Sequence, residues 1–173
     1  MAQITSDSHR LSILSSEDIE DLYGLPRFTD DDRHLYFSLS PPEREAVDVD
    51  VHTPSVAAHL ILQLGYFKAK RQFFNYSLEN ASNDLHHIHG QYFPGMSVVS
   101  MKILSRPTRL SQHQVILKLF DYNNCDRAAK DELERKAQRV AMLSTQPLYI
   151  LRESLKYLEN QRIRFYRIWS ERL

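Results

Sequence analysis

Helix-start signals recur along this chain, and they constrain its fold more than any other feature. Residues that cap helices stand before helical patterns at Ser15, Thr29, Ser40, Thr53 and Asp126, where their side chains can accept hydrogen bonds from free backbone amides. The 173 residues include only four glycines and no clean alternation of apolar and polar positions, which disfavours strands. The sequence therefore predicts an all-α protein.

Two small helical modules are expected within this all-α fold, the second with a helix-turn-helix-like core. Pro94, Gly95 and Pro107 surround an extended apolar run from Val98 to Leu104, a pattern typical of a linker that can pair as an irregular strand. Gly65 is expected to end the helix that starts at Thr53, and a further helix is expected between Ser77 and Gly90. The predicted divisions are residues 1–91, an acidic-to-basic N-terminal module; 92–107, the partly extended linker; 108–163, the second module; and 164–173, a divergent tail.

The formal net charge of zero conceals an uneven distribution. Residues 1–52 hold 4 Lys and Arg against 12 Asp and Glu, a net of −8, whereas residues 53–173 hold 18 against 10, a net of +8. A basic half indicates a polyanionic partner. The alternative is that these charges only keep the helix surfaces solvated.

The segment RPTRLSQHQVILKLFDY, residues 106–122, is the strongest candidate for such a partner surface. It predicts a short helix that begins near Thr108 and ends in a polar turn. Its predicted polar stripe comprises Ser111, Gln114 and Lys118, and its buried side Ile116, Leu119 and Phe120. Its leading turn adds side chains that can pair with phosphates or base edges, namely Arg109, Gln112 and His113.

A second helix follows over residues 127–143, and the two together have a helix-turn-helix outline. The second helix presents four cations, Arg127, Lys130, Arg135 and Arg139. The sequence leaves open which of the two helices would enter a DNA groove. The alternative is a helical hairpin that only packs.

An aromatic and basic stretch at residues 66–76 also allows two interpretations. In one, its aromatic residues belong to the core and its cations are solvated at the rim. In the other, the cations contact DNA phosphates, which position a protein without reading sequence. The cations are Lys68, Lys70 and Arg71.

The remaining chemical candidates have simpler explanations. Acids at residues 30–32 suit the first turn of a helix, and His86, His87 and His89 are spaced unfavourably for one tetrahedral metal site. Cys125 has no dedicated base, and a single cysteine excludes a disulfide framework. The chain has no phosphate-binding glycine loop, zinc-protease motif or nucleophile elbow. We therefore expect no catalytic residue, no metal site and no cofactor.

Five segments in register resemble the N-terminal region of the Tn-three family of replicative, cointegrate-forming transposases. The likeness extends over about residues 11–163. The segments are LPRFTDDDRHLYFSLS (25–40), LILQLGYFKAKRQFF (60–74), HGQYFPG (89–95), RPTRLSQHQVILKLFDY (106–122) and QPLYILRESLKYLENQRI (146–163).

This resemblance implies a function in DNA transposition without catalysis. N-terminal helical modules of such transposases bind the terminal inverted repeats of the transposon, and the acidic catalytic triad lies in a later domain that this chain lacks. Arg106, Thr108, Arg109, Gln112 and Gln114 match the second DNA-binding module, and Lys68, Lys70 and Arg71 match the basic end of the first. The tail RFYRIWSERL departs from the family pattern and is consistent with a truncated or frame-shifted product.

The sequence therefore predicts specific binding to double-stranded DNA at transposon ends. The alternatives are a protein-interaction or dimerisation module and a truncated regulator, with a second copy or a full-length transposase as partner. An acidic start and a leucine stripe at residues 148–158 support the interaction alternative. We expect a cytoplasmic, nucleoid-associated bacterial protein with neither a membrane partner nor a small-molecule substrate.

Overall fold

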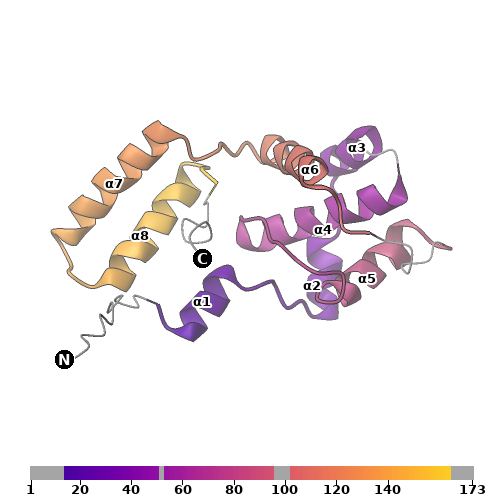
Figure 1. Ribbon diagram of the computed structural model, residues 1–173, viewed down its shortest axis with the longest axis horizontal. Helices are drawn as coiled ribbons and strands as arrows, with labels where there is room; N and C mark the ends of the chain where they lie inside the picture. Colours follow the sequence, from indigo (N-terminus) through magenta and orange to yellow (C-terminus); the bar gives the residue numbers. More distant parts are fainter. Residues whose placement is uncertain (1–13, 51–52, 96–101, 165–173) are drawn as a thin grey trace, which may run out of the picture.

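The computed structural model describes residues 14–50, 53–95 and 102–164, and within them it is all-α, as the sequence predicts (Figure 1). No helix in these three segments is long and apolar enough to cross a lipid bilayer. Residues 98–101 of the predicted irregular strand lie outside the described residues. The helices are α1 (Ser16–Tyr23), α2 (Asp30–Tyr36), α3 (Pro41–Asp50), α4 (Pro54–Lys70), α5 (Ser82–Tyr92), α6 (Arg106–Leu119), α7 (Arg127–Ala141) and α8 (Pro147–Asn160).

Four of the predicted capping residues begin their helices as expected, whereas the predicted cap Thr108 lies inside α6, which Ser105 caps. Ser15 and Thr29 each form a complete capping box, in which the side chain of the capping residue and that of an aspartate three residues later satisfy each other's backbone amides. Thr53 and Asp126 accept from the backbone amides of Val56 and Ala129. These contacts are local in sequence, which is why the sequence predicts them well.

Helix α4 is the centre of the core. Helices α2, α3, α5 and α6 pack around it (Figure 1), and every residue from 57 to 67 is buried. A helix that is buried on all sides has no solvated stripe, and residues 57–67 are accordingly apolar apart from His59, Gln63 and Gly65. The core therefore holds the other helices in fixed positions around α4.

Gly65 does not end α4, contrary to the sequence expectation. The helix continues to Lys70, and Arg71 caps it in the left-handed conformation at φ 54°. Gly65 instead lets the buried ring of Phe37 approach the helix backbone, since a Cβ built on it would lie 2.3 Å from Phe37 Cε1. Helix α5 also differs: Ser77 caps only a turn, through a bond from the amide of Asn80, and α5 runs from Ser82 past Gly90 to Tyr92.

A buried charge network joins α2, α4 and α5. The Asp84 carboxylate accepts from Arg33 Nε and from the Tyr66 hydroxyl, both at 2.8 Å. The Arg33 side chain is 15% exposed and that of Asp84 is 7% exposed. Burial strongly raises the pKa of Tyr66, and the nearby Asp84 carboxylate adds to that effect, so Tyr66 is a neutral donor. This network ties the helices that surround the core to one another.

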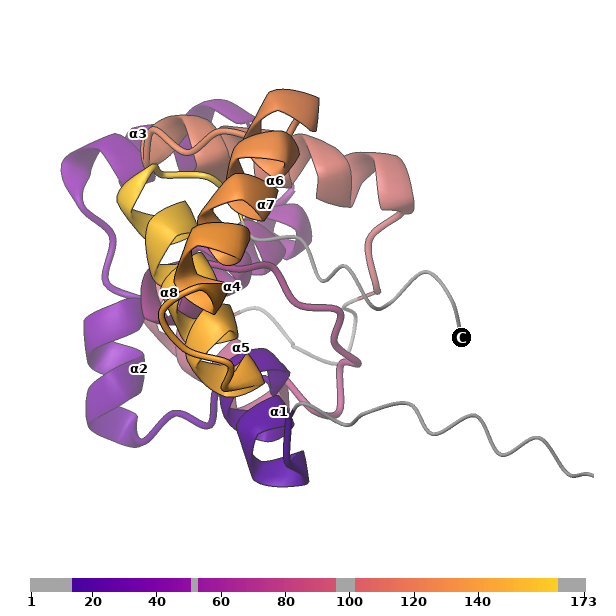
Figure 2. The same cartoon turned by 90° about the vertical axis from the view of Figure 1, so that its left-hand side faces the viewer.

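Helices α7 and α8 form an antiparallel hairpin beside the core (Figure 2). The predicted pairing of residues 109–120 with 127–143 is therefore not the pairing in the structure: α7 packs on α8, and α6 packs on α3 and α4. The apolar side of α6 packs against the core, where Ile116 and Leu117 are buried. Backbone hydrogen bonds between Asn123 and the segment at Ile163 join the hairpin to the core.

Candidate nucleic-acid interface

Helix α6 lies on the surface of the core with its polar stripe in solvent. Its first turn is fixed by Ser105, whose side chain accepts from the amide of Thr108, and by Pro107. Because Ile116 and Leu117 are buried, the side of α6 away from the core is exposed. This side carries Ser111, Gln114 and Lys118, together with Arg106 in the first turn. We call these four residues the α6 face.

The cations of the α6 face are available to a ligand. In the described segments, neither Arg106 nor Lys118 takes part in an ion pair, and both side chains are exposed. The same holds for Arg127 and Lys130, in the first turns of α7. The chain leads directly from α6 to this end of α7 (Figure 1). An anionic ligand on α6 can therefore extend toward the start of α7.

The two later cations of α7 are already paired. Glu132 binds Arg135 at 2.6 Å and Arg139 at 3.3 Å. Hydrogen bonds from both arginines lower the pKa of Glu132. Exposed pairs of this kind are weak and screened by salt, so a polyanion can compete for these arginines.

Three of the residues predicted to contact DNA make contacts within the protein instead. The Gln112 side chain is buried, and its amide donates to the Val56 carbonyl at 2.9 Å. Arg109 is half-buried and donates to Asn75 Oδ1 at 3.2 Å. Thr108 is half-buried too, and its hydroxyl is 2.8 Å from that of Ser105. The Gln112 and Arg109 side chains therefore hold α6 against the rest of the protein.

The basic end of α4 is also engaged within the protein. Lys68 Nζ donates to the Ser38 carbonyl at 2.6 Å and pairs with Glu43 at 3.1 Å, and its side chain is 17% exposed. Lys70 donates to the backbone carbonyl of Asp21. Arg71 lies over the Phe120 ring, 5.6 Å from its centroid. All three cations predicted to contact phosphates at this end of α4 therefore interact with other parts of the protein.

Acidic residues limit how a polyanion can approach α6. Helix α3 lies beside α6 (Figure 1) and exposes Glu45 and Asp48. Carboxylates on this side repel phosphates, whereas the cations at the start of α7 attract them. The electrostatic arrangement therefore favours an approach that spans α6 and the start of α7.

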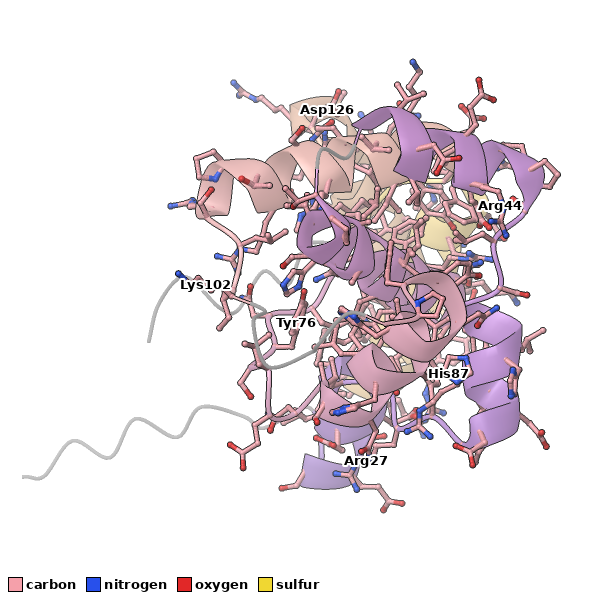
Figure 3. The ribbon with its side chains drawn as sticks, turned by 90° about the vertical axis from the view of Figure 1, so that its right-hand side faces the viewer. Arg27, Arg44, Tyr76, His87, Lys102 and Asp126 are labelled. Atoms are coloured by element: carbon pink, nitrogen blue, oxygen red, sulfur yellow. The ribbon has the colours of Figure 1, made fainter. Side chains whose placement is uncertain are left out.

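Two further residues complete this surface, and the sequence alone did not single them out. Lys102 is exposed just before α6 (Figure 3), and no ion pair in the described segments involves it. Leu110 is 45% exposed on α6, four residues before Gln114. The sequence signal that could have identified Leu110 is its spacing of four residues from Gln114, because residues i and i+4 lie on the same side of a helix.

His113 was predicted among the phosphate-pairing residues, but it is packed against an aromatic ring. Its ring lies parallel to that of Phe73, with centroids 3.8 Å apart. Burial lowers the pKa of His113 to about 4, and the positive charges of Arg164 and Arg109 add to this effect. At neutral pH His113 is therefore an uncharged packing residue.

This packing predicts a pH dependence of stability. The free energy of unfolding should fall as pH drops from 6.5 to about 4, because only the unfolded chain protonates His113 in that range. The variant His113→Phe should remove on the order of 2 kcal/mol of that loss, allowing for partial exposure. Urea unfolding at pH 7.5 and 4.5 measures the loss of unfolding free energy between the two pH values. The control is His86→Gln, which replaces an exposed histidine. An unchanged loss in His113→Phe would contradict the assignment.

The other chemical candidates do not assemble into a site in the described segments. No three or more His, Cys, Asp and Glu side chains there are arranged to hold a metal ion. His34 and His87 pack edge to face with centroids 4.7 Å apart, and His86 bonds to the Ser82 carbonyl. Burial raises the pKa of the Cys125 thiol, which works against a reactive thiolate.

Comparison with known proteins identifies one family. The model of a family described as "Domain of unknown function (DUF4158)" matches residues 13–165, a range that includes all eight helices. Neither the curated proteins nor the solved structures include a match to this chain.

Proposed function

The chain belongs to the DUF4158 family. We propose that it binds duplex DNA without catalysing a reaction, through the α6 face and the start of α7. The observation that carries this proposal is a set of four exposed cations on α6 and at the start of α7, none of which forms an ion pair among the described residues. Phosphates provide most of the affinity in such complexes. Arg106, Lys118, Arg127 and Lys130 are suited to that role.

The side chains between these cations are suited to reading bases. A major groove about 12 Å wide admits one α-helix, and α6 is exposed along one side. Gln114 can form two hydrogen bonds to adenine, Ser111 can donate to several bases, and Leu110 can contact a thymine methyl. On this basis α6 is the reading helix, and α7 contributes phosphate contacts. The sequence leaves this choice between α6 and α7 open, and the assignment of α6 as the reading helix is part of the proposal.

The finer proposal is that the duplex is the terminal inverted repeat of a transposon. It rests on the five segments that resemble the N-terminal region of Tn-three family transposases. In that setting the chain would recognise transposon ends within, or in competition with, a full-length transposase. The proposal assigns no catalytic residue to this chain.

Two substitutions on α6 test the proposal. Lys118→Ala should weaken binding to every duplex and lower the salt slope by about one, because it removes one phosphate contact. Gln114→Ala should cost about 1–3 kcal/mol on the inverted-repeat duplex and little on a scrambled one. Fluorescence anisotropy at several salt concentrations measures both effects. Arg44→Ala, on α3, is the matched control: it removes an exposed cation outside the α6 face (Figure 3). Equal binding by all variants would rule out α6.

A second candidate function is a protein-interaction module. The turn between α7 and α8 exposes Met142 at 88% and Leu143 at 83%, and exposed apolar groups often mark protein contacts. The leucine stripe of α8 supports this less, because Leu158 is buried. Light scattering with and without duplex DNA separates the two functions: a stable oligomer that ignores DNA favours interaction.

A further inference from the structure

A cleft of about 420 Å³ separates the α7–α8 hairpin from the core. The ends of α1 and α4 form one side of it, and α8 forms the other (Figure 1). We call it the hairpin cleft. Its volume falls within the range of small-molecule sites, about 300–1,000 Å³. It shares no residue with the α6 face.

Positive charge dominates the hairpin cleft. Four cations line it against a single carboxylate, that of Glu159, and the cations are Lys70, Arg71, Arg152 and Lys156. Lys156 belongs to no ion pair in the described segments, and Arg152 reaches Asp18 only at 3.7 Å. A recess lined by one sign of charge concentrates counter-ions. The cleft is therefore suited to an anion.

Arg71, which lines the cleft, provides a second observation that points to an anionic ligand. Its Nη1 atom is shielded from solvent and has no hydrogen-bond partner among the described residues. Buried donors nearly always have an acceptor. An anion in the cleft can provide one if the Arg71 side chain, which lies over the Phe120 ring, turns toward it.

The other side chains of the cleft indicate what this anion carries. Tyr23 and Tyr122 line it, with an apolar wall that includes Leu22, Leu155 and Leu158. Inorganic phosphate would leave that wall unused, whereas a flat aromatic ring can stack on a tyrosine. We propose that the hairpin cleft binds a mononucleotide-sized aromatic phosphate. The phosphate lies on Arg71 and Lys156, and the ring lies against the tyrosines and leucines.

Such a ligand has two sources, a free nucleotide or the terminal nucleotide of a DNA strand. The probes are dAMP, deoxyadenosine, inorganic phosphate and a 5′-phosphorylated pentathymidylate, titrated by calorimetry into the full chain. We expect dAMP to bind at least about tenfold more tightly than deoxyadenosine or phosphate, since only dAMP has both parts. A tighter pentathymidylate would identify the strand end as the source, and equal affinity would identify the free nucleotide.

Substitutions locate the site. Arg71→Gln and Lys156→Gln should each weaken dAMP binding about tenfold, as expected for the loss of a charged hydrogen bond. Arg44→Gln, which removes a cation from α3, should leave it unchanged. Lys156 is exposed on α8, so we expect Lys156→Gln to fold. This variant therefore still tests the site if Arg71→Gln does not fold. Absent binding, binding insensitive to Lys156→Gln, or phosphate binding as tight as dAMP binding would overturn the proposal. Duplex binding through α6 would not be affected by any of these outcomes.

Discussion

Replacing Asp84 with alanine is expected to lower the free energy of unfolding by about 3–5 kcal/mol. The carboxylate accepts hydrogen bonds from Arg33 Nε and the Tyr66 hydroxyl, both at 2.8 Å. Its removal leaves a guanidinium that is only 15% exposed without its buried partner. The remaining partner of Arg33 is Asp30, which is 91% exposed and compensates weakly because solvent screens it. Urea unfolding followed by circular dichroism measures the loss.

The matched control for Asp84→Ala removes a carboxylate that is paired at the surface. Glu132→Ala breaks two ion pairs, to Arg135 and Arg139, whose side chains are both 61% exposed. Pairs in this setting contribute at most about 1 kcal/mol. If both variants lost the same small amount, the network of Asp84 would not stabilise the core as described here.

The second large effect is expected at Gly65. Gly65→Ala should lower the free energy of unfolding by about 2 kcal/mol, because overpacking in a core costs more than the helix propensity of alanine returns. The new Cβ would lie 2.3 Å from Cε1 and 2.4 Å from Cδ1 of Phe37. The Phe37 ring is fully buried and packs against Phe28 and Tyr66, so it has little room to move.

Gly90 provides the opposite case for comparison. It lies inside α5, and a Cβ built on it meets no atom within 4 Å. Gly90→Ala should therefore raise the free energy of unfolding by about 0.5–1 kcal/mol, the usual gain in a helix interior. Differential scanning calorimetry of the two variants should show a lower unfolding temperature for Gly65→Ala and a higher one for Gly90→Ala. A neutral Gly65→Ala would mean that Phe37 can be displaced at little cost.

The sequence predicts the parts of this fold that depend on neighbours in the chain. Ser15, Thr29, Thr53 and Asp126 cap their helices as expected, because the capping bond reaches only three residues ahead. Gly65 was misinterpreted as a helix end because its role depends on Phe37, which is distant in sequence. Local patterns cannot reveal a backbone site that is kept small for a ring from another helix.

In the candidate site too, local sequence patterns predict some positions, whereas others depend on contacts with distant parts of the chain. The periodicity of α6 predicts that Ser111, Gln114 and Lys118 share an exposed stripe, and the structure places all three in solvent. Gln112, in contrast, is buried by its bond to Val56 on α4. The sequence also does not predict which helices pair. Two neighbouring amphipathic helices such as α6 and α7 can pack on each other or on separate partners, and their sequence patterns are the same in both cases. The hairpin cleft is lined by four segments that are distant in sequence, so no local motif predicts it.

Nuclear magnetic resonance tests most directly whether duplex DNA contacts α6 and the start of α7. Duplex DNA is titrated into the ¹⁵N-labelled chain, and the shifts of the backbone amides are followed. The predicted result is a continuous set of shifted amides over residues 102–118 and 127–130, lost at high salt. Shifts confined to the turn at residues 142–145, or no shifts at low salt, would contradict the assignment of this surface to DNA.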